Sequence, residues 1–137
     1  SLRRINYYCY TTIQQFILFQ EEGGMALPHP LPDELAELIA RRFRVIGEPM
    51  RIRLLDRLRE CELSVNELSE ALGASQQNVS KHLAVLAEAG IVGRRKSGTH
   101  VYYRIVDEGV FALCEQVCGS VQQQLRALNE LVEGVSS

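Results

Sequence analysis

The sequence predicts a mainly helical α+β fold, and three observations support this prediction. Two capped amphipathic helices flank a tight glycine turn, a pair of short strands meets at a basic tip, and a long C-terminal helix carries an apolar stripe. The length of 137 residues suits one domain, and 46% hydrophobic with 23% charged residues is ordinary for a globular protein. Because we find no apolar run long enough to span a bilayer, we expect a cytoplasmic protein with no membrane partner.

The first 24 residues differ from the rest, because they lack steady periodicity and end in Glu-Glu-Gly-Gly before Met25. Two interpretations are open: Met25 is the natural start and the preceding residues are foreign, or these residues form a genuine N-terminal arm. Neither gives them a motif. We therefore expect a poorly ordered N-terminal extension over residues 1–30 and one folded domain over residues 31–137.

Two helices are expected at the start of the domain. Asp33 and Glu34 place acidic groups in a first helical turn, where the helix dipole favours them. Gly47-Glu48-Pro49 breaks this helix, and a second runs from Pro49 to about Glu60. Each has an apolar face, formed by Leu35, Leu38, Ile39, Phe43 and Ile46 in the first and by Ile52, Leu54, Leu55 and Leu58 in the second.

Next comes a pair of short helices with clear start and stop signals. Ser64 caps the first, and Glu67 completes a capping box. Gly73 stops this helix, Ser75 caps the next, and Gly90 ends it. A helix, a tight turn containing glycine and a second helix are typical of a helix-turn-helix motif.

The second of these helices has one apolar and one polar face. Val79, Leu83 and Leu86 are predicted to point to the core. The candidate DNA contacts are Ser75, Gln76, Gln77, Ser80, Lys81 and His82. Gln suits adenine and Lys suits guanine in the major groove, so this face is predicted to meet base edges near the helix N-terminus. A merely solvated polar face is the alternative.

The strands Ile91–Lys96 and Thr99–Ile105, joined at Ser97-Gly98, are predicted to form a basic hairpin, or wing. Its candidate DNA contacts are Arg94, Arg95, Lys96 and His100, acting on phosphate or in the minor groove. Strand alternation puts Arg94 and Lys96 on the opposite face from Arg95. Solubilising charge on a hairpin edge is the alternative interpretation.

Charge is segregated along the chain, although the net charge is only −2. Residues 75–104 contain five basic residues and one acidic residue, a net +4. Residues 105–137 contain one basic residue and five acidic residues, a net −4. A basic face for DNA and an acidic C-terminal helix can therefore coexist in one acidic protein.

A long helix is expected from Asp107 to about Glu133. Its apolar stripe consists of Val110, Cys114, Val117, Val121, Leu125, Leu128 and Val132. This stripe exceeds what one small core can cover, so we predict that a second copy covers it in a homodimer.

Taken together, these segments resemble the ArsR/SmtB family of bacterial winged helix-turn-helix repressors. The resemblance runs from about Leu31 to the end of the chain and rests on Gly47–Leu55, Glu62–Gly73, Ser75–Leu86, Gly90–Val92 and Gly98–Arg104. It implies a homodimeric repressor that binds an inverted-repeat operator in double-stranded DNA. It also implies release by a metal ion, a metalloid or a thiol oxidant.

Two effector sites known in that family are altered in this sequence. Ser64-Val65-Asn66 stands where the family pattern has Cys-Val-Cys, so both thiolates are missing. At the other site Asp107 matches, but Gly109, Ser120 and Gln123 are poor transition-metal ligands. We therefore expect neither site to bind its usual metal.

Cys114 and Cys118 remain as candidates for an effector site, since they lie one helical turn apart on the long helix. Across a two-fold axis, two such pairs could offer four thiolates to Zn(II), Cd(II) or As(III). Oxidation to intersubunit disulfides is a second interpretation. The third is that both are small hydrophobic residues packed in the dimer seam.

No nucleophile–base–acid set, phosphate-binding loop or metal-hydrolase motif appears in the sequence, so we predict a protein that is not an enzyme. Two alternatives to an effector-released repressor remain open. One is a repressor controlled by its abundance or by a partner. The other is a winged-helix module that binds proteins rather than DNA.

Overall fold

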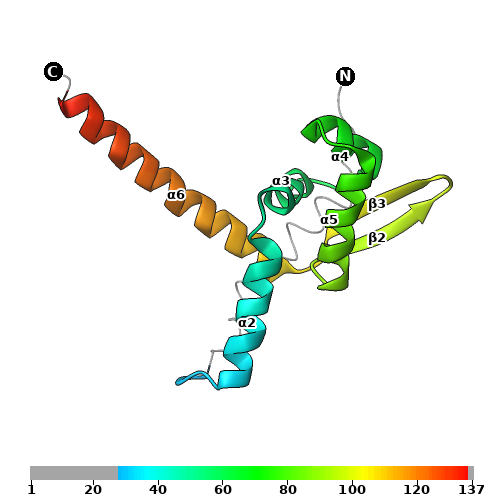
Figure 1. Cartoon of the computed structure of the whole chain (residues 1–137), viewed down its shortest axis with the longest axis horizontal. Coiled ribbons are helices and arrows are strands. Elements are labelled where there is room, and N and C mark those ends of the chain that lie inside the picture. Colours follow the sequence, from blue (N-terminus) through cyan, green and yellow to red (C-terminus); the bar gives the residue numbers. More distant parts are fainter. Residues whose placement is uncertain (1–27, 136–137) are drawn as a thin grey trace. The chain divides into compact units, whose positions relative to one another are not determined.

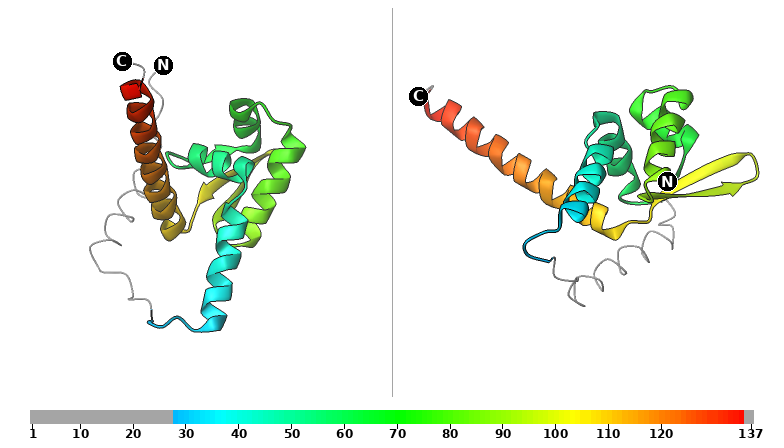
Figure 2. Two further views of the ribbon diagram at one scale, coloured as in Figure 1. Left: turned by 60° about the vertical axis from the view of Figure 1, so that its left-hand side comes forward. Right: turned by 60° about the horizontal axis from the view of Figure 1, so that its bottom comes forward.

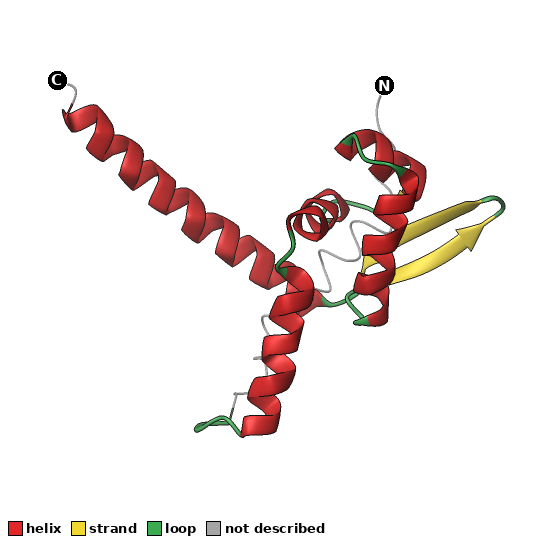
Figure 3. Ribbon diagram, viewed as in Figure 1, coloured by secondary structure: helices red, strands yellow, loops and turns green. Residues whose placement is uncertain are grey.

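The computed structural model describes residues 28–135, so the predictions about residues 1–27 lie outside the described residues. The chain forms two compact units, with the boundary between Val106 and Asp107. Figure 1 identifies the elements of both units along the chain. Helices predominate, and the strands are confined to one small sheet (Figure 3).

The first unit contains four helices and three strands within the described residues. They are α2 (Asp33–Ile46), α3 (Pro49–Leu58), β1 (Leu63–Ser64), α4 (Val65–Leu72), α5 (Gln76–Glu88), β2 (Val92–Ser97) and β3 (His100–Ile105). The predicted helices and hairpin are all present, with bounds shifted by at most a few residues. Strand β1 is an addition, because two residues are too few to show a strand period.

The sheet has the order β1-β3-β2 and is antiparallel throughout. Val92 pairs with Ile105, Arg94 with Tyr103 and Arg95 with Tyr102. Val92, Tyr103 and Ile105 are buried, so one face of the sheet forms part of the core. The opposite face carries Arg95 and Tyr102.

Local sequence signals explain where the helices begin. Glu48 accepts a hydrogen bond from the backbone N–H of Arg51 at 3.0 Å and so caps α3, while Pro49 occupies its first turn. Ser64 and Glu67 form the predicted capping box of α4.

The core of the first unit is mainly aliphatic, and α3, α4 and α5 contribute seven of the twelve buried hydrophobic residues that the structure describes there. Leu54 and Leu55 from α3, Leu68 from α4, and Val79, Leu83 and Leu86 from α5 are at most 1% exposed. The apolar faces predicted for α3 and α5 are therefore confirmed for these residues. Burial on this scale fixes the orientation of α5 and determines which of its side chains remain outside.

The second unit is the helix α6 (Glu108–Val135), whose 28 residues give a length of about 42 Å. Asp107 Oδ1 accepts a hydrogen bond from the backbone N–H of Val110 at 3.2 Å, which caps the helix start. Among residues 28–135, no helix is both long and apolar enough to cross a membrane.

Candidate nucleic-acid interface

The connection between α4 and α5 is a three-residue turn. Gly73 adopts the left-handed conformation with φ of 62°, which glycine tolerates without strain. The backbone N–H of Ala74 then donates to the Ser69 carbonyl at 3.2 Å. Ser75 accepts from the backbone N–H of Asn78 at 3.1 Å, so its hydroxyl caps α5. This turn sets two helices at a fixed angle, as DNA-binding helix-turn-helix motifs require.

The polar side chains at the start of α5 are exposed, as predicted. They are Ser75, Gln76, Gln77, Ser80 and Lys81. Val79 and Leu83, on the other face of the helix, are completely buried. The face therefore presents amide, hydroxyl and ammonium groups outward from a rigid helix, which suits contact with base edges.

One of these side chains has a partner that the sequence did not reveal. The side-chain amide of Gln76 donates to the side-chain oxygen of Asn66 on α4. Asn66 thus links the first helix of the motif to the second. The Gln77 side chain, on the same turn of α5, is exposed.

His82, the remaining candidate contact on α5, is turned away from the exposed polar face. His82 lies three residues after Val79 and four before Leu86, so helical geometry turns it toward the buried face. Its side chain is only 15% exposed, and its Nδ1 lies 3.7 Å from a carboxylate oxygen of Glu48. His82 therefore faces the start of α3 instead of extending the polar face, and its Nδ1 is too far from Glu48 for a hydrogen bond.

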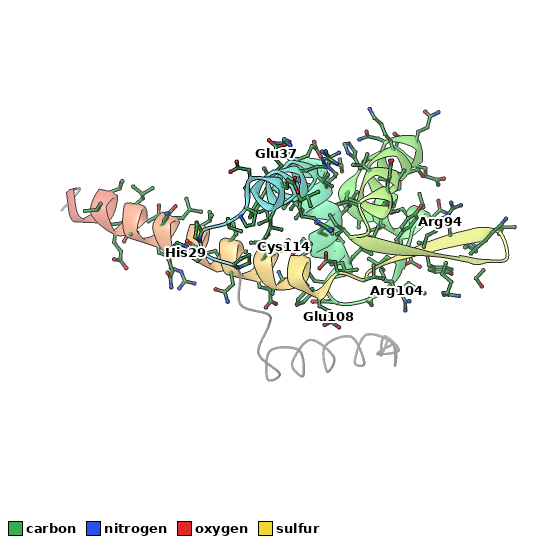
Figure 4. The ribbon with its side chains drawn as sticks, turned by 90° about the horizontal axis from the view of Figure 1, so that it is seen from below. His29, Glu37, Arg94, Arg104, Glu108 and Cys114 are labelled. Carbon is green, nitrogen blue, oxygen red and sulfur yellow. The ribbon has the colours of Figure 1, made fainter. Side chains whose placement is uncertain are left out.

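The wing is the hairpin of β2 and β3, which turns at Gly98 with φ of 62°. It projects beyond the helices in Figure 1 and in the right-hand view of Figure 2. Arg94, Lys96 and His100 are exposed. Arg94 lies on the side of the hairpin where α4 and α5 lie, whereas Arg104 lies on the other side (Figure 4).

Arg95, the remaining predicted contact in the wing, has partners within the protein. Its Nε and Nη2 lie 3.1 Å and 2.5 Å from Oε1 of Glu62, in the loop before β1. Its guanidinium also lies 4.9 Å from the centroid of the Tyr102 ring. Glu62 and Tyr102 were not identified from the sequence. The strand register would have suggested Tyr102, but no sequence pattern points to Glu62.

The residues at the altered effector positions have structural roles. Ser64 is buried and caps α4, and Asn66 is bonded to Gln76. Asp107 caps α6. Ser64 and Asn66 do not fit a soft-metal site, because neither supplies a thiolate or an imidazole.

Cys114 and Cys118 lie on α6, where Cys114 is half-buried and Cys118 exposed. Figure 4 labels Cys114 near the N-terminal end of this helix. Both cysteines are thiols and neither forms a disulfide. Among the described residues no group of three or more His, Cys, Asp or Glu side chains is arranged to hold a metal ion. The Cys114–Cys118 pair of one chain therefore provides two ligands fewer than a tetrahedral site needs.

A helix-turn-helix followed by a β-hairpin wing defines the class of winged helix-turn-helix DNA-binding proteins. Residues 48–93 match the family model described as bacterial regulatory protein, arsR family. The HTH-type transcriptional regulator KmtR of Mycobacterium tuberculosis is 41% identical over 83 residues, covering 61% of this chain and 64% of KmtR. The chain thus spans less than two thirds of the length of that relative.

Two further proteins extend the similarity. A biofilm growth-associated repressor of Xylella fastidiosa is 32% identical over 93 residues, covering 66% of this chain and 82% of the repressor. A homodimeric winged helix-turn-helix DNA-binding domain from Mycobacterium bovis, solved by NMR and described as a possible ArsR-family regulator, has a TM-score of 0.64 at 28% identity. That similarity covers 73% of this chain and 95% of the domain.

The chain belongs to the arsR family of bacterial regulatory proteins. This membership confirms the predicted family and fold class. KmtR is named a transcriptional regulator and the X. fastidiosa relative a repressor, which agrees with the prediction that the chain is not an enzyme.

Proposed function

We propose that the protein is a homodimeric transcriptional repressor that acts on operator DNA in the cytoplasm. The observation that carries this proposal is the exposed polar face at the N-terminal end of α5, held outward by the buried Val79 and Leu83. A basic wing accompanies this face in the same compact unit. Base contacts and phosphate contacts then come from two adjoining elements.

In this proposal the first two turns of α5 enter the major groove. Gln76, Gln77, Ser80 and Lys81 face base edges, and Ser75 lies at the capped end near the phosphates. Arg94, Lys96 and His100 approach the flanking backbone. In a dimer, the two copies of α5 would enter major grooves about one turn of the DNA duplex apart. The two-fold symmetry of the dimer then predicts an inverted-repeat operator.

The proposed dimer rests on the apolar stripe of α6. Six large hydrophobic residues of this helix, between 47% and 68% exposed in the single chain, are Val117, Val121, Leu125, Leu128, Leu131 and Val132. A continuous apolar face of this length is costly in water unless another helix covers it. The homodimeric state of the M. bovis neighbour supports the same assembly.

The effector we propose is thiol-reactive or thiophilic, and its site is the Cys114–Cys118 pair. The two residues are four apart on α6, so their side chains leave one face of the helix. Two pairs from a dimer would provide four sulfur ligands for an ion such as Zn(II), or the thiols for an oxidative crosslink. Either event would release DNA only by favouring a dimer geometry whose α5 helices no longer match the groove spacing.

Fluorescence anisotropy on the promoter DNA of the protein's own gene tests both parts of the proposal. Reduced, metal-free protein should bind this DNA more tightly than random duplex, with affinity falling steeply as salt rises. Equal, weak binding to both DNAs would refute a repressor and favour a protein-binding module.

Addition of Zn(II) or of a thiol oxidant tests the effector site. If either addition releases the DNA from the wild-type protein but not from the double variant Cys114→Ser/Cys118→Ser, the pair is the effector site. Operator binding that is indifferent to both additions would refute it, leaving packed thiols and a repressor controlled by abundance or by a partner.

A further inference from the structure

We propose that Arg95 is a positioning residue of the wing and that Glu62 withholds its charge from DNA. This inference rests on the proposed function, because it concerns how the wing neutralises phosphate. It divides the basic wing into cations that meet DNA, Arg94 and Lys96, and one cation that orients the wing.

The first argument is the geometry of the ion pair. Arg95 donates from two nitrogens to Glu62, with Nε 3.1 Å and 3.3 Å from the two carboxylate oxygens and Nη2 2.5 Å from one of them. A two-nitrogen contact of this kind fixes the guanidinium in orientation as well as in place. The Glu62 side chain is 11% exposed and the Arg95 side chain 56% exposed, so the carboxylate is shielded from water while the guanidinium is only partly covered.

The second argument is a row of contacts along one face of the wing. The Arg95 guanidinium lies over the Tyr102 ring, and the Tyr102 and His100 rings have centroids 6.3 Å apart with a tilt of 55°. Both separations are in the range of favourable cation–π and aromatic contacts. Glu62, Arg95, Tyr102 and His100 therefore connect the loop before β1 to the tip of the hairpin.

The third argument is the direction of the side chains. Strand alternation places Arg95 on the same face as Arg104 and on the opposite face from Arg94. Arg94 is on the side of the hairpin where α4 and α5 lie, and Arg104 is on the other side (Figure 4). Arg94 therefore shares a side with the helix that would enter the groove, whereas Arg95 faces the Glu62 carboxylate.

The salt dependence of DNA binding distinguishes the two kinds of cation. Each phosphate neutralised by the protein contributes about −0.9 to the slope of log K against log salt. We would measure anisotropy of the full chain on one mixed-sequence duplex between about 50 and 200 mM salt, which requires no knowledge of the operator. Arg94→Ala, an adjacent exposed arginine, is the matched control and should make the slope shallower by about 0.9.

Arg95→Ala should weaken binding several-fold at every salt concentration and leave the slope unchanged. Glu62→Gln should make the slope steeper by up to about 0.9, because Arg95 becomes available to a phosphate. The double variant Glu62→Gln/Arg95→Ala should return the slope to the wild-type value. A slope that becomes shallower by about 0.9 in Arg95→Ala, or stays unchanged in Glu62→Gln, would overturn the proposal.

A measurement without DNA separates this inference from the proposed function. Glu62→Gln and Arg95→Ala should each lower Tm, and the double variant should lower Tm no further than the worse single variant. If the protein fails to bind any duplex, the proposed function fails, yet the Tm cycle still tests the ion pair. Additive Tm losses would show that Glu62 and Arg95 act independently and would refute it.

Discussion

Adjacent glutamines at the start of α5 differ in their surroundings, and this difference has consequences for DNA recognition. Gln76 is bonded to Asn66, so its amide is oriented by α4 before any DNA arrives. Gln77 extends from the same turn into solvent. Because the Gln76 side chain is already oriented, it would lose little conformational entropy on binding DNA. The Gln77 side chain would lose more, and only a contact with a matching base would offset that loss.

Gln77→Ala should lower specificity more than affinity. A bidentate glutamine–adenine contact discriminates against other bases by about 1–3 kcal/mol, so the variant should lose about that much on operator DNA and little on random duplex. Competition anisotropy with both DNAs measures the difference. Arg94→Ala is the control, because a phosphate contact should weaken both DNAs equally. Equal losses for Gln77→Ala would exclude Gln77 as a base-reading residue.

At the scale of elements, caps stabilise the helix-turn-helix in addition to its buried core. The capping box of α4 joins Ser64 Oγ to the backbone N–H of Glu67 at 3.1 Å and the Glu67 carboxylate to the backbone N–H of Ser64 at 3.4 Å. Ser64 also belongs to β1, opposite Tyr102. The same residue therefore fixes the start of a helix and the edge of the sheet that carries the wing.

Ser64→Ala should lower the free energy of unfolding by about 1 kcal/mol, because a buried N-cap hydroxyl is lost. Urea denaturation at one fixed protein concentration should show a lower midpoint with an unchanged m-value. Ser97→Ala removes an exposed hydroxyl at the end of β2 and should leave the midpoint within error of the wild type. A Ser64→Ala midpoint equal to that of Ser97→Ala would contradict the stabilising role of the cap.

The boundaries of the helices and of the hairpin were predictable from sequence because caps, glycine stops and apolar periods are local signals. Ser64, Gly73 and Ser75 each act on residues within one turn of themselves. The short strand β1 was not predictable, since its pairing with β3 spans almost forty positions of sequence and involves only Leu63 and Ser64.

The candidate site was predictable only in part. The exposure of the polar face of α5 and the inward turn of His82 both follow from the helical period, but the proximity of His82 to Glu48 depends on the position of α3. The partner of Arg95 is 33 residues away in the sequence. A charge count or strand alternation does not identify such a pair, because both use only residues close together in the sequence.

At the scale of the whole molecule, the described chain consists of two compact units. The first carries the candidate DNA-binding face and wing (the reading unit), and the second is the long helix α6. The reading unit ends at Val106, and α6 follows from Glu108. The stripe on α6 accounts for six of the large hydrophobic residues that are exposed in the single chain. We expect its burial against a second copy to govern assembly, because apolar burial is the main favourable contribution to association.

Leu125→Glu should shift the protein toward monomer, because it places a charge in the middle of the stripe, where the side chain is 55% exposed in the single chain. Sedimentation velocity over a range of concentrations measures this shift. Gln124→Glu makes a similar change in charge at the adjacent exposed position and is the control. A wild-type dimer that Leu125→Glu leaves unaffected would exclude the central stripe as the interface.

The boundary at Val106 also has a genetic consequence. In a homodimer joined through α6, an allele with a damaged α5 or wing still makes a subunit that can pair with a normal one. Expressed together with the normal allele in equal amounts, it would leave about one quarter of the dimers with two intact reading units, as random pairing requires. Such alleles should be dominant over wild type. Alleles that disrupt the stripe of α6 would make subunits unable to pair and should be recessive.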